Sequence, residues 1–291
     1  MTEVAFDRTS EDLGNLVELG HVNYRIPDQG LATTFYVSGL GLTRDPFMMT
    51  GTSNMWVNIG NSQFHLPTGP AVVAPGILTG LVVPDLDALR ARLSKIAKDL
   101  AGTAFSVSDA DGFVAVTCPW GNRLRCHAPD PVRFGSVRLG MAYVDLEVPR
   151  GTANGIARFY REIIGARAKL EEGRDGAIAR ITCGPGQSLL FTEKLSSADP
   201  CPQHHIQIYL ADFSGPYDRL KKLGCTIRES SRHQYSFAHL RDPATGADLF
   251  GLDHETRSMT HPMFGRALIN RDASQGIGGY KAGRDHFDWH L

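Results

Sequence analysis

The sequence predicts an α+β protein built from four βαβββ modules that pair into two incomplete barrels. The first observation is an internal repeat: Leu31–Leu42 (LATTFYVSGLGL) returns as Gly155–Ala166 (GIARFYREIIGA), each copy after a strand that ends in Pro. The second is that each half of the 291-residue chain contains the same order of elements twice: an apolar strand, a helix, and three strands separated by turns. Because repeats of this size stack and bury a shared core, each curved sheet is expected to cover the open face of another.

The first two modules are defined by apolar strands and turn residues. The first is predicted to contain a strand at Leu19–Pro27, the Phe35-Tyr36 helix, and strands at Met55–Ile59 and Ser62–Leu66. The second is predicted to contain a strand at Gly76–Pro84, a helix at Leu86–Leu100, and strands at Phe113–Thr117 and Arg123–His127. In that helix, Leu86, Leu89, Leu93 and Ile96 form one apolar stripe, which indicates packing against a sheet.

The third and fourth modules repeat this order from Met141 to about Lys194 and from His204 to about Glu255. The predicted organisation is an N-terminal extension (1–18), a first two-module domain (19–130), a second two-module domain (138–255) and a C-terminal tail (256–291). The boundary is placed at Pro129–Arg138, where Pro, Asp and Gly cluster.

Composition points to a small-molecule partner. Thirty basic and 31 acidic residues give a net charge of −1, and the chain has no basic stripe with interleaved aromatics, so nucleic acid is not expected as a partner. Its most apolar stretch is short and broken by glycine, so we expect no membrane segment and a cytoplasmic location. The aromatic end of the tail, Asp285–Leu291, is expected to pack over a barrel mouth or against a second subunit of a homo-oligomer.

The two Phe-Tyr helices, the turns at Cys118–Asn122 and Asp242–Gly246, and the strand starts at His21 and His205 resemble the vicinal oxygen chelate superfamily. This superfamily includes glyoxalases, fosfomycin and bleomycin resistance proteins, and type I extradiol ring-cleaving dioxygenases. The resemblance extends from about Leu19 to Glu255. It implies the glyoxalase/bleomycin resistance/extradiol dioxygenase fold, with one metal-ligand position on the first strand and one on the last strand of each module. Several chemistries share this fold, so the resemblance does not select one activity.

Counting from the strand-ending residues locates these positions. His21 lies six residues before Pro27, and the equivalent first-strand positions of the other modules are Leu78, Tyr143 and His205. The comparable last-strand positions are predicted to be His65, Arg125, Phe191 and Phe250. Histidine therefore occupies the first-strand position in the first and fourth modules.

His21, His65 and His205 would meet in one barrel if the first module paired with the fourth, a hypothesis that rests on where the histidines fall. Three imidazoles would hold a divalent metal and leave positions open to a substrate with two adjacent oxygens. We favour Fe(II), with Zn, Mn or Ni as alternatives. The competing interpretation is that these are core or surface histidines without a metal.

Two known ligand patterns can be compared with the chain. The resemblance carries the extradiol ligand set of two histidines and one glutamate onto Tyr143, His205 and Phe250, and one of these three positions is retained. Glyoxalase-type enzymes use glutamates that can act as bases. Glu255, in a polar stretch expected just after the final strand, is a candidate fourth ligand or general base; the alternative is a solvated connection.

Several other side chains are candidates for the site. Tyr143, as a catalytic residue, and Tyr209, as a substrate-binding residue, can donate hydrogen bonds to a bound oxygen. Trp56 and Asn58 alternate on one face of a strand and are predicted to line a pocket for substrate. Phe47, Met48 and Met49 would give an apolar wall. For all of these, core packing is the alternative.

The sequence therefore predicts a metal-dependent enzyme acting on a small, partly apolar substrate with adjacent oxygens. A non-haem iron dioxygenase is favoured, because a metal held by neutral histidines keeps its full positive charge and open positions. The alternatives are a glyoxalase-type lyase or isomerase and a non-catalytic protein that binds or sequesters a small molecule.

Overall fold

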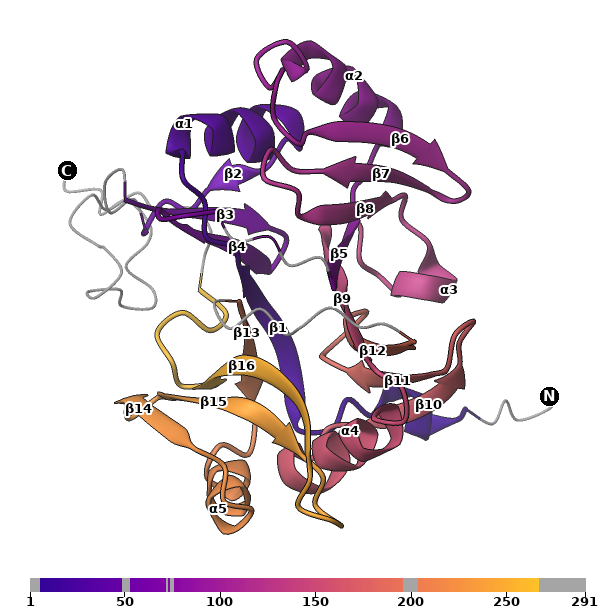
Figure 1. Ribbon diagram of the computed structural model, residues 1–291, viewed down its shortest axis with the longest axis vertical. Coiled ribbons are helices and arrows are strands. Elements are labelled where there is room, and N and C mark those ends of the chain that lie inside the picture. The colour runs from indigo at the N-terminus through magenta and orange to yellow at the C-terminus, as the bar shows by residue number, and fades with distance from the viewer. Residues whose placement is uncertain (1–5, 49–52, 72, 74–75, 196–203, 267–291) are drawn as a thin grey trace, which may run out of the picture.

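The computed structural model describes residues 6–48, 53–71, 73, 76–195 and 204–266, and within them the four predicted βαβββ modules are present (Figure 1). The first module consists of β1 (Leu16–Asn23), α1 (Gln29–Ala32), η2 (Thr33–Gly39), β2 (Thr43–Arg44), β3 (Asn54–Ile59) and β4 (Ser62–Pro67). The second consists of β5 (Ile77–Val82), α2 (Leu86–Ile96), β6 (Ser106–Ala110), β7 (Phe113–Thr117) and β8 (Arg123–His127).

The second half of the chain repeats this order. The third module consists of β9 (Gly140–Pro149), α4 (Ala153–Phe159), η3 (Tyr160–Ile164), β10 (Ala168–Glu172), β11 (Ala177–Thr182) and β12 (Ser188–Lys194). The fourth consists of β13 (His205–Leu210), α5 (Ser214–Lys222), β14 (Ile227–Ser231), β15 (Gln234–Arg241) and β16 (Asp248–Ser258). Two short helices lie outside the modules: η1 (Arg8–Glu11), and α3 (Pro131–Phe134) in the predicted boundary segment.

The modules pair in crossed order. One eight-stranded sheet runs β14-β15-β16-β13-β1-β4-β3-β2 and joins the first and fourth modules; the other runs β10-β11-β12-β9-β5-β8-β7-β6 and joins the second and third. The junctions are the antiparallel pairs β1–β13 and β5–β9. The expected domains, 19–130 and 138–255, thus each give one module to each sheet.

The repeated Phe-Tyr motif produces the same irregular helix twice. In the first module α1 continues into a π-helix, η2, and in the third α4 continues into a π-helix, η3. Phe35, Tyr36, Phe159 and Tyr160 are all fully buried. The motif therefore anchors each helix in the core through two adjacent aromatic rings.

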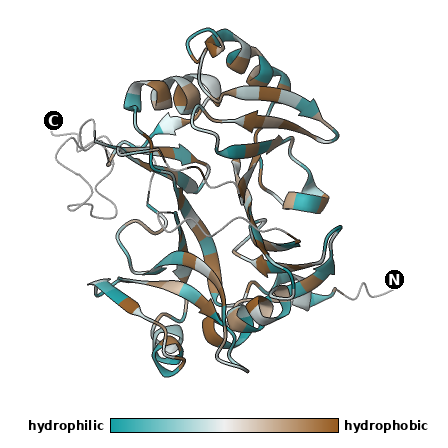
Figure 2. Ribbon diagram, viewed as in Figure 1, coloured by the Kyte–Doolittle hydropathy of each residue, from teal (hydrophilic) through white to brown (hydrophobic). Residues whose placement is uncertain are grey.

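One hydrophobic core draws on all four modules and includes Tyr24, Val116, Phe191 and Phe237. The helix α2 buries Leu89, Leu93 and Ile96 against it, as the apolar stripe predicted, although the helix ends at Ile96 rather than Leu100. Apolar residues recur along the inner strands, and hydrophilic residues gather on the outer helices and turns (Figure 2). Within the described residues, no helix is long and apolar enough to cross a membrane.

Two last-strand positions were predicted incorrectly. β16 continues to Ser258, so Glu255 lies inside the strand rather than after it. Asn23, two residues after His21, pairs with His65, while Gln207, two residues after His205, pairs with Glu255. Glu255, and not Phe250, is therefore the fourth-module counterpart of His65.

In the third module the same rule gives Leu190 in place of Phe191, because Asp145, two residues after Tyr143, pairs with Leu190. Some predictions fall outside the described residues, among them Met49 in the apolar wall and the aromatic end of the tail. Of the predicted tail, the described part is 256–266.

Candidate metal centre

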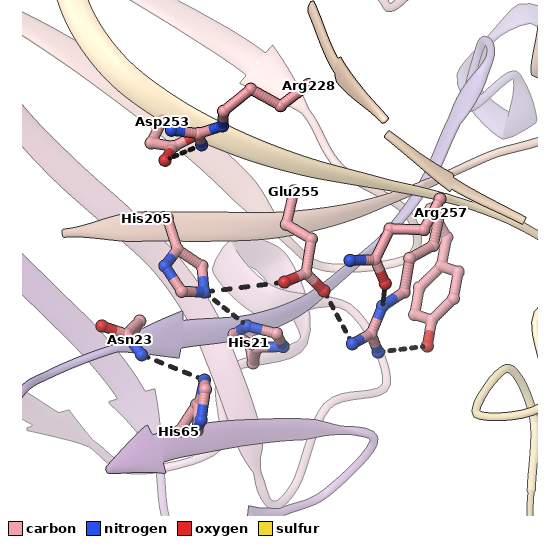
Figure 3. Close-up of polar contacts among 10 residues, drawn as sticks. His21, Asn23, His65, His205, Arg228, Asp253, Glu255 and Arg257 are labelled. Atoms are coloured by element: carbon pink, nitrogen blue, oxygen red, sulfur yellow. Dashed lines mark hydrogen bonds and ion pairs between the residues drawn. The ribbon is translucent and has the colours of Figure 1, made fainter. Parts of the chain in front are cut away.

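Three histidines from three neighbouring strands converge on one point. His21 comes from β1, His65 from β4 and His205 from β13, and one ligand nitrogen from each lies within 4.8 Å of the others (Figure 3). The Nε2 atoms of His21 and His205 are 3.1 Å apart. Since metal–nitrogen bonds are about 2 Å long, two ligands of one ion lie about 3 Å apart. The crossed pairing of modules, which the sequence raised as a hypothesis, produces this arrangement.

Glu255 supplies a carboxylate beside the three rings. Its Oε2 atom lies 3.8 Å from His205 Nε2, and its Oε1 atom forms an ion pair of 2.6 Å with Arg257 (Figure 3). Asp253, two residues earlier on the same strand, is held by an ion pair with Arg228. The first and fourth modules thus offer a donor set of three imidazoles and one carboxylate.

The environment keeps the imidazoles neutral, which is the form that binds metals. Burial lowers the pKa of His65 to about 3, with further effects from His205 and Arg257. Burial also places the pKa of His21 well below its usual value, again assisted by the positive potential of His205 and Arg257. For His205 burial lowers the pKa, and the nearby carboxylates of Glu255 and Asp253 partly oppose this.

Neighbouring groups fix the ring of His65. The Asn23 amide lies 3.0 Å from His65 Nδ1, and Trp56 stacks on the ring at 3.8 Å with an interplanar angle of 11°. Turning the amide by 180° would present its oxygen to Nδ1 and keep the proton there, which leaves the Nε2 lone pair available. Such outer contacts are typical of metal-ligating histidines.

Two ring nitrogens at this point, His65 Nε2 and His21 Nδ1, are buried and have no hydrogen-bond partner among the residues that the structure describes. A buried polar atom without a partner is costly, and those in a native structure usually have a functional reason. The ion would satisfy His65 Nε2. The donors present therefore fit a divalent transition metal, for which imidazole is a suitable ligand.

Three of the other predicted site residues lie in the same sheet as the histidines, and one, Tyr143, lies in the other sheet. Trp56 lies against both His65 and His21, and its ring centroid is 4.9 Å from that of His21. Asn58 accepts a 2.6 Å hydrogen bond from Gln63, and the Tyr209 hydroxyl accepts one of 3.4 Å from Arg257. These three residues belong to the same sheet as the histidines.

Tyr143 lies in the other sheet, so it does not join the histidine cluster. Its hydroxyl forms a 2.9 Å hydrogen bond with Nε2 of His127. The prediction that Tyr143 acts in the same site as His21 therefore does not agree with its position. Tyr143 does occupy the first-strand position that matches His21. However, Tyr143 belongs to the third module, which pairs with the second module and not with the first.

Sequence reasoning missed several residues around the cluster. Arg257 binds Glu255, Tyr209 and Gln234, and Met263 packs with Met48 and Trp56. Arg266 forms a buried ion pair with Asp45. The alternation of Asp253, Glu255 and Arg257 was the available signal, since every second residue of a strand faces the same side.

Comparison with known proteins identifies the fold. No protein-family model matches the chain, and no curated protein matches it. Glyoxalase I from Zea mays superimposes with a TM-score of 0.61 at 15% identity, over 84% of this chain and 92% of that chain. A proposed dioxygenase from Bacillus subtilis superimposes with a TM-score of 0.54 at 15% identity, over 84% of this chain and 86% of that chain.

The chain therefore has the fold of the vicinal oxygen chelate superfamily, as the Phe-Tyr repeats and turns indicated. Its four βαβββ modules form two incomplete barrels, which confirms the predicted fold class. At this level of identity the likeness concerns the fold, and the chemistry has to be argued from the side chains.

Proposed function

We propose that this protein is a metal-dependent enzyme that acts on a small, partly apolar substrate with two adjacent oxygens, and that it is a non-haem iron dioxygenase. The observation that carries the proposal is the convergence of His21, His65 and His205 beside Glu255. The likeness in fold to glyoxalase I and to a proposed dioxygenase supports enzyme function in general.

The donor set favours Fe(II). Imidazole nitrogens suit Fe, Zn, Ni and Cu, and three neutral rings with one carboxylate leave a divalent ion with net positive charge. With His21, His65 and His205 as the protein ligands and Glu255 acting as a base, the ion would keep positions open for both oxygens of a substrate and for dioxygen. When bound, the ion would polarise the substrate oxygens and supply the redox chemistry needed for reaction with dioxygen.

The surrounding residues have distinct roles in this proposal. Glu255 is placed to accept a proton from a substrate hydroxyl or to act as the fourth ligand, and its ion pair with Arg257 holds the carboxylate beside the three rings. Trp56, stacked on His65, and Asn58 form the wall of the substrate site. The Tyr209 hydroxyl accepts a hydrogen bond from Arg257, so its own proton is available for a hydrogen bond to a substrate oxygen.

Glu255 also favours a second candidate, a glyoxalase-type lyase or isomerase. It occupies the register position that matches His65 in the first module, so the site pairs a metal-ligand position with a carboxylate base. Such a base can remove an acidic proton beside a carbonyl, in a reaction that needs no dioxygen.

The test is turnover under two metal and oxygen regimes. Protein loaded anaerobically with Fe(II) is mixed with a panel of catechols, and oxygen uptake is recorded with an electrode. Protein loaded with Zn(II) or Ni(II) is assayed without oxygen on the hemithioacetal of methylglyoxal and glutathione. We expect Fe(II)-dependent oxygen uptake that His21→Ala reduces at least 100-fold and that Tyr143→Phe leaves within twofold.

Each result separates the candidates. Oxygen-independent turnover of the hemithioacetal with no oxygen uptake would replace the dioxygenase proposal with the lyase or isomerase. Tight binding of aromatic ligands without metal and without turnover would instead support a non-catalytic binding or resistance protein.

A further inference from the structure

A small cavity adjoins the histidine cluster on the same sheet. Its volume is about 150 Å³, and its lining includes Glu18, Gln63, Gln207, Tyr209, Met263 and Arg266. An enclosed space of this order accommodates a ring the size of benzene. It has room for a short polar arm of a substrate.

The cavity continues the face of the sheet that carries the metal donors. Gln207 lies two residues after His205 on β13, and Gln63 lies two residues before His65 on β4. Alternate residues of a strand point to the same side and are about 7 Å apart. Gln63 and Gln207 also pair with His21 from either side. The cavity therefore lies beside the cluster on the same face of the sheet.

Two buried hydrogen-bond donors in its wall have no partner within the described part of the chain. Gln207 is 1% exposed and Arg266 is 9% exposed, and their Nε2 and NH1 atoms respectively lack a hydrogen-bond partner. The other terminal nitrogen of Arg266 is bound to the buried carboxylate of Asp45. Because a buried donor left unpaired is costly, these two atoms are available to donate to an acceptor group in the cavity.

The remaining polar groups of the cavity are compatible with an oxyanion. The Tyr209 hydroxyl, which accepts from Arg257, keeps its own proton for donation. Burial raises the pKa of Glu18 to about 7, so near neutral pH about half of the molecules carry this carboxyl in its protonated form, which can also donate. The positive charges of Arg257 and Arg266 are each paired with one carboxylate, Glu255 and Asp45.

We propose that this cavity binds a carboxylate group of the substrate, so that the substrate is a small acid whose adjacent oxygens reach the histidine cluster. This inference rests on the proposed function for the role of the cluster. Charge-assisted hydrogen bonds from a guanidinium are a common means of carboxylate recognition. Gln207 and Arg266 would supply the two donors, which no group among the described residues satisfies.

The test compares matched probes at equilibrium without oxygen. Binding of 3,4-dihydroxybenzoate, catechol and benzoate to the metal-loaded protein is followed by calorimetry. The dihydroxybenzoate is expected to bind at least 10-fold more tightly than catechol. Gln207→Leu and Arg266→Gln should reduce this preference to less than threefold and leave catechol binding within twofold. Arg174→Gln is the control for the change in charge, because Arg174 is exposed in the turn between β10 and β11 of the other sheet.

Two outcomes would overturn the inference: equal affinity of the wild type for catechol and dihydroxybenzoate, or equal weakening of both probes by Gln207→Leu. Gln207→Leu keeps the Arg266–Asp45 pair, so it remains informative if Arg266→Gln does not fold. Benzoate separates this inference from the proposed function, because it needs no metal. Benzoate binding that is lost in Gln207→Leu supports the cavity as a carboxylate site even if the protein holds no metal.

Discussion

The two sheets of this molecule have the same architecture and carry different side chains at equivalent positions. In the sheet formed by the first and fourth modules these positions hold His21, His65, His205 and Glu255. In the sheet formed by the second and third modules they hold Leu78, Arg125, Tyr143 and Leu190. One sheet thus presents four potential metal donors, and the other presents two leucines, an arginine and a tyrosine.

The second sheet is filled where the first carries its histidines. Leu78, Val82, Ala142 and Tyr143 pack with Phe134, which comes from the short helix α3 between the modules. Tyr143 satisfies its hydroxyl on His127. In the first sheet the covering segment comes from after β16, where Met263 packs on Trp56. The comparison shows that module duplication provides the scaffold, while individual residues decide which sheet can carry a reaction.

The two copies of the Phe-Tyr motif give the largest predicted difference in stability. The Tyr160 hydroxyl forms a 2.6 Å hydrogen bond with Nε2 of the buried His254, whereas the buried Tyr36 hydroxyl has no partner. Tyr160→Phe leaves the His254 nitrogen unpaired and should lower the free energy of unfolding by about 2 kcal/mol. Tyr36→Phe removes an unpaired polar group and should be neutral or stabilising. Urea denaturation of both variants measures the difference.

Equal losses of stability in the two variants would contradict this account of the repeat. Tyr217→Phe provides a control for loss of a hydroxyl, because the Tyr217 hydroxyl binds the exposed side chain of Glu229. We expect a change in this control of less than about 1 kcal/mol.

Glu18 is predicted to have a smaller effect on the free energy of unfolding than Tyr160, and this effect depends on pH. Burial raises its pKa from 4.5 to about 7 in the folded protein, so the folded state binds this proton more tightly than the unfolded state. The corresponding stability is present below pH 4.5 and is lost as the pH rises to 7. For this partly exposed side chain we expect a loss of about 1–2 kcal/mol between pH 5 and pH 8.

Glu18→Gln should remove that part of the pH dependence, as measured by chemical denaturation at a series of pH values. At the matching position of the third module, three residues before Tyr143, the chain has Gly140, so this position of the second sheet contributes no such slope. An unchanged slope in Glu18→Gln would show that another group is responsible.

Sequence reasoning located the histidines but misplaced the carboxylate. His21 and His205 were found because Pro27 and the repeat fixed a common register along the first strands. Glu255 was expected outside the last strand because 253–258 is polar on both faces. The structure explains this: Glu255 and Arg257 lie on the side of the histidine cluster, while His254 is buried on the other side against Phe237 and Tyr160. A strand with polar residues on both faces has no hydrophobic alternation to identify it.

The pairing of modules was also beyond the sequence alone. The repeat predicts four similar units, and either order of pairing buries their open faces. The distribution of histidines favoured the crossed order, which the structure has. The sequence also did not show that apolar side chains cover the second sheet. The covering residue, Phe134, lies in α3, within a boundary segment that looked like a linker.

The central claim is that the first sheet, and not the second, holds a metal ion. The direct measurement is the metal content of purified protein by elemental analysis, for the wild type, His21→Ala and His127→Ala. We expect about one equivalent of a divalent transition metal in the wild type and in His127→Ala, and near-zero content in His21→Ala. Equal metal content in the wild type and His21→Ala, whether one equivalent or none, would contradict the claim.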